Sequence, residues 1–243
     1  RAGVGVDNID LAAAKAHNVT VVNSPTATTL AVAELTMALM LSVVREVPRG
    51  DAGMKAGQWL KKELMGAELW RKTLGVIGFG RIGIAVAERA KAFDMDIISY
   101  HPRRTADQIR EAGGEPVSFD ELLAKSDIIT LHIPLTAETK HILNAEAFAK
   151  MKDGVIIICA ARGGVIDEEA LLAALESGKV AAAGLDVFAT EPPGLTPLVA
   201  HPKVVCMPHV GGQTMEAQMR AADDIASEVL AALKGEPLRW KVA

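Results

Sequence analysis

The sequence predicts an α/β fold built on a doubly wound parallel sheet, and three observations lead to this prediction. From Lys72 onward, short runs rich in Val and Ile alternate with helical stretches, which is typical of parallel strands covered on both faces. A glycine-rich turn joins the first of these strands directly to a helix. Half of the 243 residues are apolar (50%), so the chain can bury a large core.

The residues before this alternation have a mixed pattern. A helix is expected at Leu11–Ala16 and a short strand at Val19–Val22. A second helix, Thr29–Glu46, is apolar nearly all round, which indicates burial between domains or subunits, and we expect Pro48 to end it. The charged segment 49–72 then fits either a solvated connector or a subunit contact.

Six strands and six helices are expected in the alternating part. The expected strands are Thr73–Ile77, Asp96–Tyr100, Ile128–Leu131, Val155–Ala160, Ala182–Leu185 and Val204–Met207. The expected helices are Ile84–Phe93, Ala106–Ala112, Phe119–Lys125, Ala145–Lys150, Glu168–Ser177 and Thr214–Lys234. Gly235 is a suitable stop for the last of these helices.

Composition and charge argue against several kinds of partner. The net charge is −4 and no Lys/Arg run exceeds two residues, so nucleic acid is not expected as a partner. Cys159 and Cys206 lie in apolar runs without metal-ligand spacing, which indicates buried thiols, a reducing compartment and no metal site. The most apolar stretch, Leu30–Val44, is too short to span a bilayer, and we see no signal peptide. We therefore expect a cytoplasmic protein without a membrane partner.

The glycine-rich turn has the spacing of a dinucleotide site. Gly78 permits a tight turn, Gly80 lets the backbone approach a pyrophosphate, and Gly83 lets the helix pack close to its strand. Arg81 and Ile82 lie between the last two glycines, at the helix N-terminus, whose free N–H groups and positive dipole end favour phosphate. The sequence thus predicts binding of a dinucleotide here.

Titratable side chains follow three successive strands of the predicted sheet. Arg162, Glu191 and His209 come after the strands that end near residues 160, 185 and 207, and ligands gather at this edge of such sheets. Arginine can hold a carboxylate by two parallel hydrogen bonds. Histidine can exchange a hydroxyl proton near neutral pH, and a neighbouring carboxylate favours and orients the imidazolium. This set suits the oxidation of a 2-hydroxy acid.

Four motifs resemble those of the D-isomer-specific 2-hydroxyacid dehydrogenases: VIGFGRIG, ARGGVIDEEAL, GLDVFATEPP and MPHVGG. They spread over nearly all of residues 1–234. The resemblance implies NAD or NADP as the cofactor, Arg162 and His209 in contact with both substrate and cofactor, and Glu191 in support of His209 as the acid/base. It also implies further cofactor residues at Val4, Ile133, Pro134, Ala160 and Asp186, and substrate residues at Arg1 and Gly3. His132, near a strand end, is expected close to the cofactor.

Within this family, the sequence most resembles the D-3-phosphoglycerate dehydrogenases, in RAGVGVDNID, NSPTATTLAVAEL and ELMGAELWRKTLG. This implies conversion of 3-phosphoglycerate to 3-phosphohydroxypyruvate, as in serine biosynthesis. It also implies three parts of the chain. Residues 1–24 are expected to be the tail end of a substrate-binding lobe, of which only this remnant is present. Residues 25–213 are expected to form the dinucleotide-binding (Rossmann) domain, and the helix in 214–243 to return toward the lobe. A homodimer through Thr29–Lys72 is expected.

One departure from the family concerns the end of the second strand. An acidic residue usually stands there for the ribose 2′-hydroxyl, whereas this sequence has His101, Arg103 and Arg104. Because these arginines can pair with a 2′-phosphate, we expect NADP(H) to be accepted. The alternative enzyme is then an NADPH-dependent glyoxylate/hydroxypyruvate reductase. Alternatives of another class are an NAD(H)-sensing, corepressor-like binding protein and an isolated cofactor-binding fragment without activity.

Overall fold

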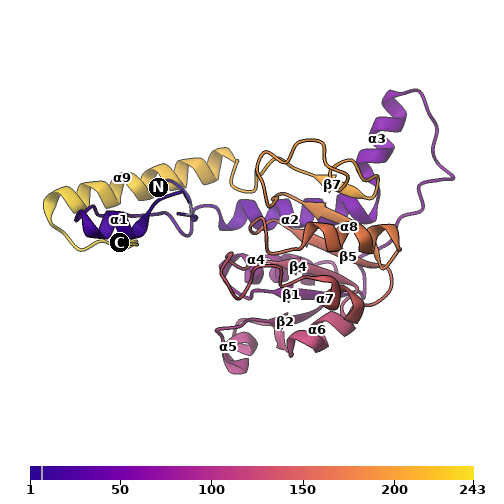
Figure 1. Ribbon diagram of the computed structural model, residues 1–243, viewed down its shortest axis with the longest axis horizontal. Coiled ribbons are helices and arrows are strands. Elements are labelled where there is room, and N and C mark those ends of the chain that lie inside the picture. Colours follow the sequence, from indigo (N-terminus) through magenta and orange to yellow (C-terminus); the bar gives the residue numbers. More distant parts are fainter. Residues whose placement is uncertain (7) are drawn as a thin grey trace. The chain divides into compact units, whose positions relative to one another are not determined.

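The computed structural model describes residues 1–6 and 8–243, which form two compact units. One unit combines the described residues of 1–32 with 210–243, and the other comprises 33–209 (Figure 1). No helix in the described ranges has the length and apolar character needed to cross a membrane.

The unit formed by residues 33–209 is built on a seven-stranded sheet in which every neighbouring pair is parallel. The strand order is β3-β2-β1-β4-β5-β6-β7, which is the order of the Rossmann fold with one further strand. The predicted doubly wound parallel sheet is therefore confirmed. Its strands are β1 (Thr73–Ile77), β2 (Asp96–Tyr100), β3 (Glu115–Pro116), β4 (Ile128–Leu131), β5 (Val155–Cys159), β6 (Val180–Leu185) and β7 (Val204–Cys206).

Helices cover both faces of this sheet. On one face, a core cluster joins apolar side chains of the strands to Leu122 of α6, Phe148 of α7 and Leu171 of α8. On the other face, Met40 of α2 and Val86 of α4 pack on the strands. The helices of this part of the chain are α2 (Thr29–Val44), α3 (Val47–Lys55), α4 (Arg81–Lys91), α5 (Ala106–Glu111), α6 (Phe119–Lys125), α7 (Ala145–Lys150) and α8 (Glu168–Glu176).

Short side chains define where several of these helices begin. The side chains of Thr105, Ser118, Asn144 and Asp167 each accept a hydrogen bond from a backbone N–H in the first turn of the helix that follows. Such caps satisfy donors that have no partner inside the helix. Each cap thus fixes the residue at which its helix begins.

The helix α2 ends differently from the prediction. Glu46, not Pro48, stops it: Glu46 has a left-handed backbone (φ 50°), and α3 begins at the next residue. Pro48 lies in the first turn of α3, where its missing N–H would have no helical partner in any case. The apolar side chains of α2, such as Leu39 and Met40, pack on the chain's own sheet, which accounts for most of its apolar pattern.

One strand was missed, and one expected strand was wrong. The two-residue edge strand β3 was not predicted, since it is very short and contains Pro116. Val19–Val22 does not form a regular strand, because Val22 makes only an isolated antiparallel bridge to Lys241.

The other unit contains α1 (Leu11–Ala16) and the long helix α9 (Met215–Lys234). Gly235 ends α9 in a left-handed conformation (φ 68°), as predicted. The chain then returns along α9, and the buried Glu228 carboxylate accepts hydrogen bonds from the backbone N–H groups of Arg239 (3.2 Å) and Trp240 (2.9 Å). Val21 donates to the carbonyl of Ala243 (2.9 Å), so the segment around Val21 pairs with the segment that follows α9.

Candidate active site

The turn between β1 and α4 is packed tightly on the protein itself at two of its three glycines. Gly78 has a φ of 99°, and a Cβ there would overlap the carbonyl group of His132 at the end of β4. A Cβ at Gly83 would overlap the carbonyl oxygen of Gly78. Glycine is thus required at both positions by backbone conformation or close approach.

The middle glycine has the opposite surroundings. A Cβ at Gly80 would meet no atom within 4 Å, and its φ of −90° is open to any residue. Gly80 is also the N-cap of α4 and provides no side chain to the N–H groups of the first turn, which contains Arg81 and Ile82. Open space above uncapped N–H groups and a positive dipole end fits the diphosphate of a dinucleotide.

Basic side chains lie just past β2. The backbone N–H of Arg103 donates to Nδ1 of His101 (3.0 Å). Burial, followed by the charges of Arg104 and Arg103, lowers the pKa of His101, which favours the neutral ring that can accept this bond. The charge of Arg103 also reaches the next loop, where it helps the Thr136 hydroxyl to lower the pKa of Glu138.

His132 lies at the end of β4, beside Gly78. Its Nε2 is 3.0 Å from the buried Thr130 hydroxyl, whereas Nδ1 is buried and has no hydrogen-bond partner among the described residues. Burial lowers the pKa of His132 to about 3, so the ring stays neutral at physiological pH. Ile133 is buried, and the carbonyl of Pro134 accepts a hydrogen bond from the Thr139 hydroxyl (2.6 Å).

The strands β5, β6 and β7 end side by side. Their pairing places Cys159, Leu185 and Cys206 in one row across the sheet. The loops that carry Arg162, Glu191 and His209 therefore leave the sheet at neighbouring positions, spaced by about 4.8 Å, the usual distance between strands. The sheet brings together three segments that are distant in sequence.

Glu191 and His209 form the direct contact in this group. Glu191 Oε2 lies 2.6 Å from Nδ1 of His209, and Glu191 Oε1 accepts from the backbone N–H of Phe188 (3.0 Å). An ionised carboxylate only accepts, so Nδ1 carries the hydrogen and Nε2 is the ring nitrogen left for a ligand. The side chains are 35% (Glu191) and 46% (His209) exposed, so the pair is open to solvent.

The other predicted residues of the β5 and β6 loops follow the ends of those two strands. Arg162 is half-buried, and its Nη1 donates to the carbonyl of Ala161 (2.7 Å). Ala160 is buried at the end of β5. Asp186 is buried directly after β6, where its backbone N–H donates to the carbonyl of Cys159 (2.9 Å).

Arg1, Gly3 and Val4 belong to the other compact unit. Within it, the terminal amino group of Arg1 donates to the carbonyl of Val22 (2.9 Å), and the carbonyl of Val4 accepts from the Asn23 amide (2.8 Å). The carbonyl of Gly3 accepts from the backbone N–H of Ser24 (3.0 Å). Across residues 1–6 and 8–243, no group of three or more His, Cys, Asp or Glu side chains has a metal-binding arrangement.

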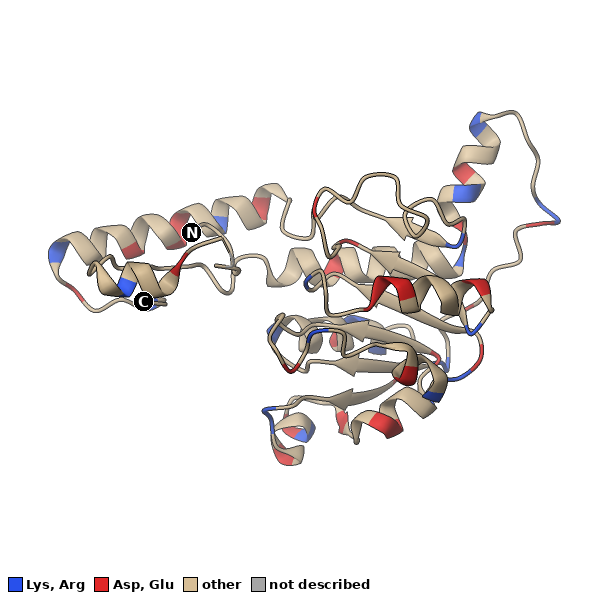
Figure 2. Cartoon of the chain, viewed as in Figure 1, with Lys and Arg blue, Asp and Glu red and all other residues tan. Residues whose placement is uncertain are grey.

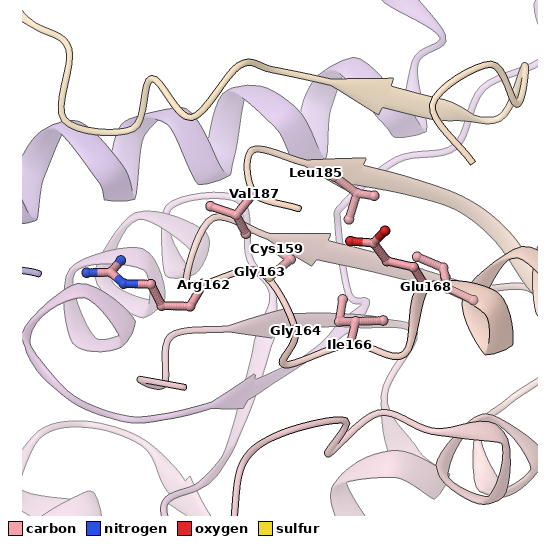
Figure 3. A pocket seen from close by; sticks show the side chains of 9 residues that line it. Cys159, Arg162, Gly163, Gly164, Ile166, Glu168, Leu185 and Val187 are labelled. Carbon is pink, nitrogen blue, oxygen red and sulfur yellow. The ribbon is translucent and has the colours of Figure 1, made fainter. Parts of the chain in front are cut away.

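Sequence reasoning missed Glu168, on the first turn of α8. Its carboxylate accepts from the backbone N–H of Ala189 (2.6 Å) in the loop that carries Glu191. Figure 3 shows the Glu168 carboxylate directed toward Leu185 at the end of the sheet, while Arg162 points away on the other side of the same turn. The available signal was an acidic residue in the motif ARGGVIDEEAL that was not needed to cap α8, because Asp167 does so.

Comparison with known proteins gives one consistent result. Residues 37–211 match the family described as D-isomer specific 2-hydroxyacid dehydrogenase, NAD binding domain. The chain is 48% identical over 238 residues to a D-3-phosphoglycerate dehydrogenase of Bacillus subtilis, covering 98% of this chain and 45% of that protein. It is 50% identical over 232 residues to a hydroxypyruvate reductase of Thermotoga maritima, covering 94% and 75%.

A solved structure agrees with these sequence matches. The structure of a glyoxylate reductase from Paecilomyes thermophila superposes with a TM-score of 0.92 at 41% identity, covering 99% of this chain and 73% of that one. The chain spans less than half of the length of the phosphoglycerate dehydrogenases that it matches, for example 38% and 45% of two of them.

Proposed function

The chain belongs to the D-isomer specific 2-hydroxyacid dehydrogenase family through its NAD-binding domain, and we propose that the protein transfers a hydride between a nicotinamide cofactor and a small 2-hydroxy acid. The observation that carries this proposal is the 2.6 Å contact between Glu191 and His209 at the ends of β6 and β7. It supplies an oriented acid/base at the end of the same sheet whose first strand, β1, leads into a nucleotide-type turn.

Each side chain of the site has a role in the proposed reaction. Nε2 of His209 takes the proton of the substrate hydroxyl during oxidation and returns it during reduction. Glu191 holds the ring through Nδ1 and stabilises the imidazolium that forms. Arg162 binds the substrate carboxylate through two parallel hydrogen bonds. The cofactor, when bound, supplies the hydride acceptor or donor.

The same proposal assigns the cofactor to named residues. The diphosphate would lie on the turn of Gly78, Gly80, Arg81, Ile82 and Gly83, since Gly80 leaves open space above the helix N-terminus. The nicotinamide half would lie along the strand ends, at Ile133, Pro134, Ala160 and Asp186. For the residues of the other unit, Arg1 and Gly3 are proposed as substrate residues and Val4 as a cofactor residue.

We propose 3-phosphoglycerate as the substrate to test first, because several D-3-phosphoglycerate dehydrogenases are among the similar proteins. Turnover is followed by the absorbance of the reduced nicotinamide, with NAD or NADP and 3-phosphoglycerate in one direction. Glyoxylate and hydroxypyruvate are tested with each reduced cofactor in the other direction. Loss of general acid/base catalysis in His209→Ala is expected to lower kcat by about 10²–10⁴-fold. Undiminished turnover in this variant would contradict the assigned role of His209.

A second candidate, an NADPH-dependent glyoxylate/hydroxypyruvate reductase, is favoured by the basic side chains after β2. Arg103 and Arg104 follow the end of β2, where other dehydrogenases of this kind usually have an acidic residue. An acidic residue would repel the 2′-phosphate of NADPH, whereas these arginines can pair with it. The similar hydroxypyruvate and glyoxylate reductases also support it. Turnover confined to NADPH with glyoxylate or hydroxypyruvate would select this candidate.

A nucleotide-sensing, corepressor-like protein is the candidate of another class. Such a protein would bind NADH with unchanged affinity in His209→Ala and turn over none of the tested acids. Cofactor titration by fluorescence, run beside the activity assay, therefore separates a sensor from an enzyme.

We also propose that the protein forms a homodimer through Thr29–Lys72. The support comes from the arm that follows α2, where Trp59 is 75% and Met65 is 85% exposed. Large apolar side chains exposed in one segment mark a contact surface. Trp59→Glu is expected to convert a dimer to a monomer in sedimentation at micromolar concentration, and a wild-type monomer would contradict the proposal.

A further inference from the structure

We propose that Glu168 is a positioning residue, which holds the loop of Glu191 in place and thereby orients His209. The inference rests on the proposed function, because it gives Glu168 a role through the Glu191–His209 pair. It assigns a task to an acidic side chain that neither caps α8 nor contacts His209.

Two adjacent backbone N–H groups in the loop after β6 are each held by a different carboxylate. Phe188 donates to Glu191 Oε1 (3.0 Å), and Ala189 donates to Glu168 Oε1 (2.6 Å). The first bond joins residues three positions apart and so moves with the loop. The second joins the loop to α8, 21 residues away in sequence, and fixes the loop to the body of the unit.

The position of the Glu168 carboxylate is itself well defined. Asp167 accepts from the N–H groups of Glu169 and Ala170 (3.1 Å each), which fixes the first turn of α8. The carboxylate is directed toward the ends of β5 and β6 (Figure 3). In agreement, burial raises the pKa of the Cys159 thiol to about 11, and the negative charges of Asp186 and Glu168 contribute to this rise.

A close backbone contact lies on the other side of the loop. A Cβ at Gly163 would overlap the carbonyl group of Phe188, so the turn that carries Arg162 lies directly against this loop. Packing of this kind limits how near the loop can come, whereas the hydrogen bond from Ala189 limits how far it can move away. Together, they leave Glu191 a narrow range of positions from which to reach His209.

A helix-dipole effect is the competing explanation for an acidic residue at this point. Glu168 and Glu169 both lie in the first turn of α8, where negative charge is favourable (Figure 2). The two explanations separate in Glu168→Gln, which keeps an oxygen acceptor for Ala189 and loses the charge. Glu169→Ala is the matched control, since it removes a charge from the same turn without touching the loop.

The test measures the loop and the histidine directly in the full chain. Amide hydrogen exchange of Ala189 and the NMR signal of the His209 Nδ1 proton, assigned with His209→Gln, are compared across the variants. In Glu168→Ala, we expect exchange at Ala189 to be about tenfold faster, because its hydrogen-bond acceptor is lost, and the His209 signal to shift or broaden. Glu168→Gln and Glu169→Ala are expected to resemble the wild type.

Two results would overturn the proposal. An unchanged His209 signal in Glu168→Ala would show that the loop is held without Glu168. Equal effects of Glu168→Gln and Glu168→Ala would assign the role to charge at the helix end.

In turnover assays, Glu168→Ala is expected to lower kcat about tenfold with the Kd for NADH unchanged. In a Glu191→Gln background, Glu168→Ala is expected to lower kcat little further. An active His209→Ala would contradict the proposed function alone, because the NMR comparison does not depend on turnover.

Discussion

His132, whose Nδ1 is buried without a hydrogen-bond partner among the described residues, makes a testable contribution to the pH dependence of stability. Its pKa is 6.5 when exposed and about 3 in the folded protein, because burial disfavours the charged ring. Between these values the unfolded chain binds a proton that the folded chain does not, so stability falls as the pH falls below 6.5. At about 1.4 kcal/mol per pKa unit, lowering the pH from 7 to 5 is expected to cost about 2 kcal/mol through this residue.

Urea unfolding of the wild type and of His132→Gln at pH 7 and pH 5 measures this contribution. The quantity compared is the change in unfolding free energy between the two pH values, so a general loss of stability in the variant cancels. We expect the wild type to lose about 2 kcal/mol more than His132→Gln, and the control His17→Gln, at an exposed position, to behave as the wild type. Equal losses in wild type and His132→Gln would refute the reasoning and show that the ring is hydrated or protonated at little cost.

Three further predictions concern the nucleotide turn, the cofactor and the thiols. Gly83→Ala is expected to lower the free energy of unfolding by about 1–3 kcal/mol, since its Cβ overlaps the Gly78 carbonyl. Gly80→Ala should lower this free energy less, as measured by thermal unfolding, and should weaken NADH binding by about tenfold. The double variant Arg103→Ala/Arg104→Ala should lower the preference for NADPH over NADH by about tenfold with NADH binding unchanged, and an unaltered ratio of the two Kd values would contradict the role of these arginines. Alkylation at pH 8 should leave Cys159 unmodified in the folded protein, because burial raises its pKa to about 11, and mass spectrometry of the native and unfolded chains checks this.

The sheet could be predicted from sequence because each of its inner strands carries an unambiguous signal. The strands β1, β2 and β4 have the predicted bounds, and their side chains alternate between two cores; Leu74 and Val76 face one, and Ile77 faces the other. A strand buried on both faces is a continuous apolar run bounded by polar turns, which is visible without knowledge of its neighbours. The glycine turn is predictable because it joins β1, a continuous apolar run, directly to the helical stretch of α4.

The features that were missed depend either on a local backbone conformation or on contacts between distant residues. Pro48 was expected to stop α2, but the sequence pattern does not show that Glu46 takes a left-handed backbone and that proline starts the next helix. The edge strand β3 exists only through pairing with β2. Glu168 was missed because its partner, the backbone N–H of Ala189, leaves no mark in the sequence.

The geometry of the candidate site follows from the order of its strands. Because β6 lies between β5 and β7, the Glu191 loop is flanked by the loop of Arg162 on one side and by His209 on the other. Glu191 can therefore contact His209 only if its own loop neither collapses toward β5 nor drifts away from it. Gly163 and the hydrogen bond to Glu168 set those two limits, so the turn that carries Arg162 also helps to fix the Glu191–His209 pair. A larger residue in place of Gly163 should then displace the His209 ring as strongly as removal of the Glu191 side chain does.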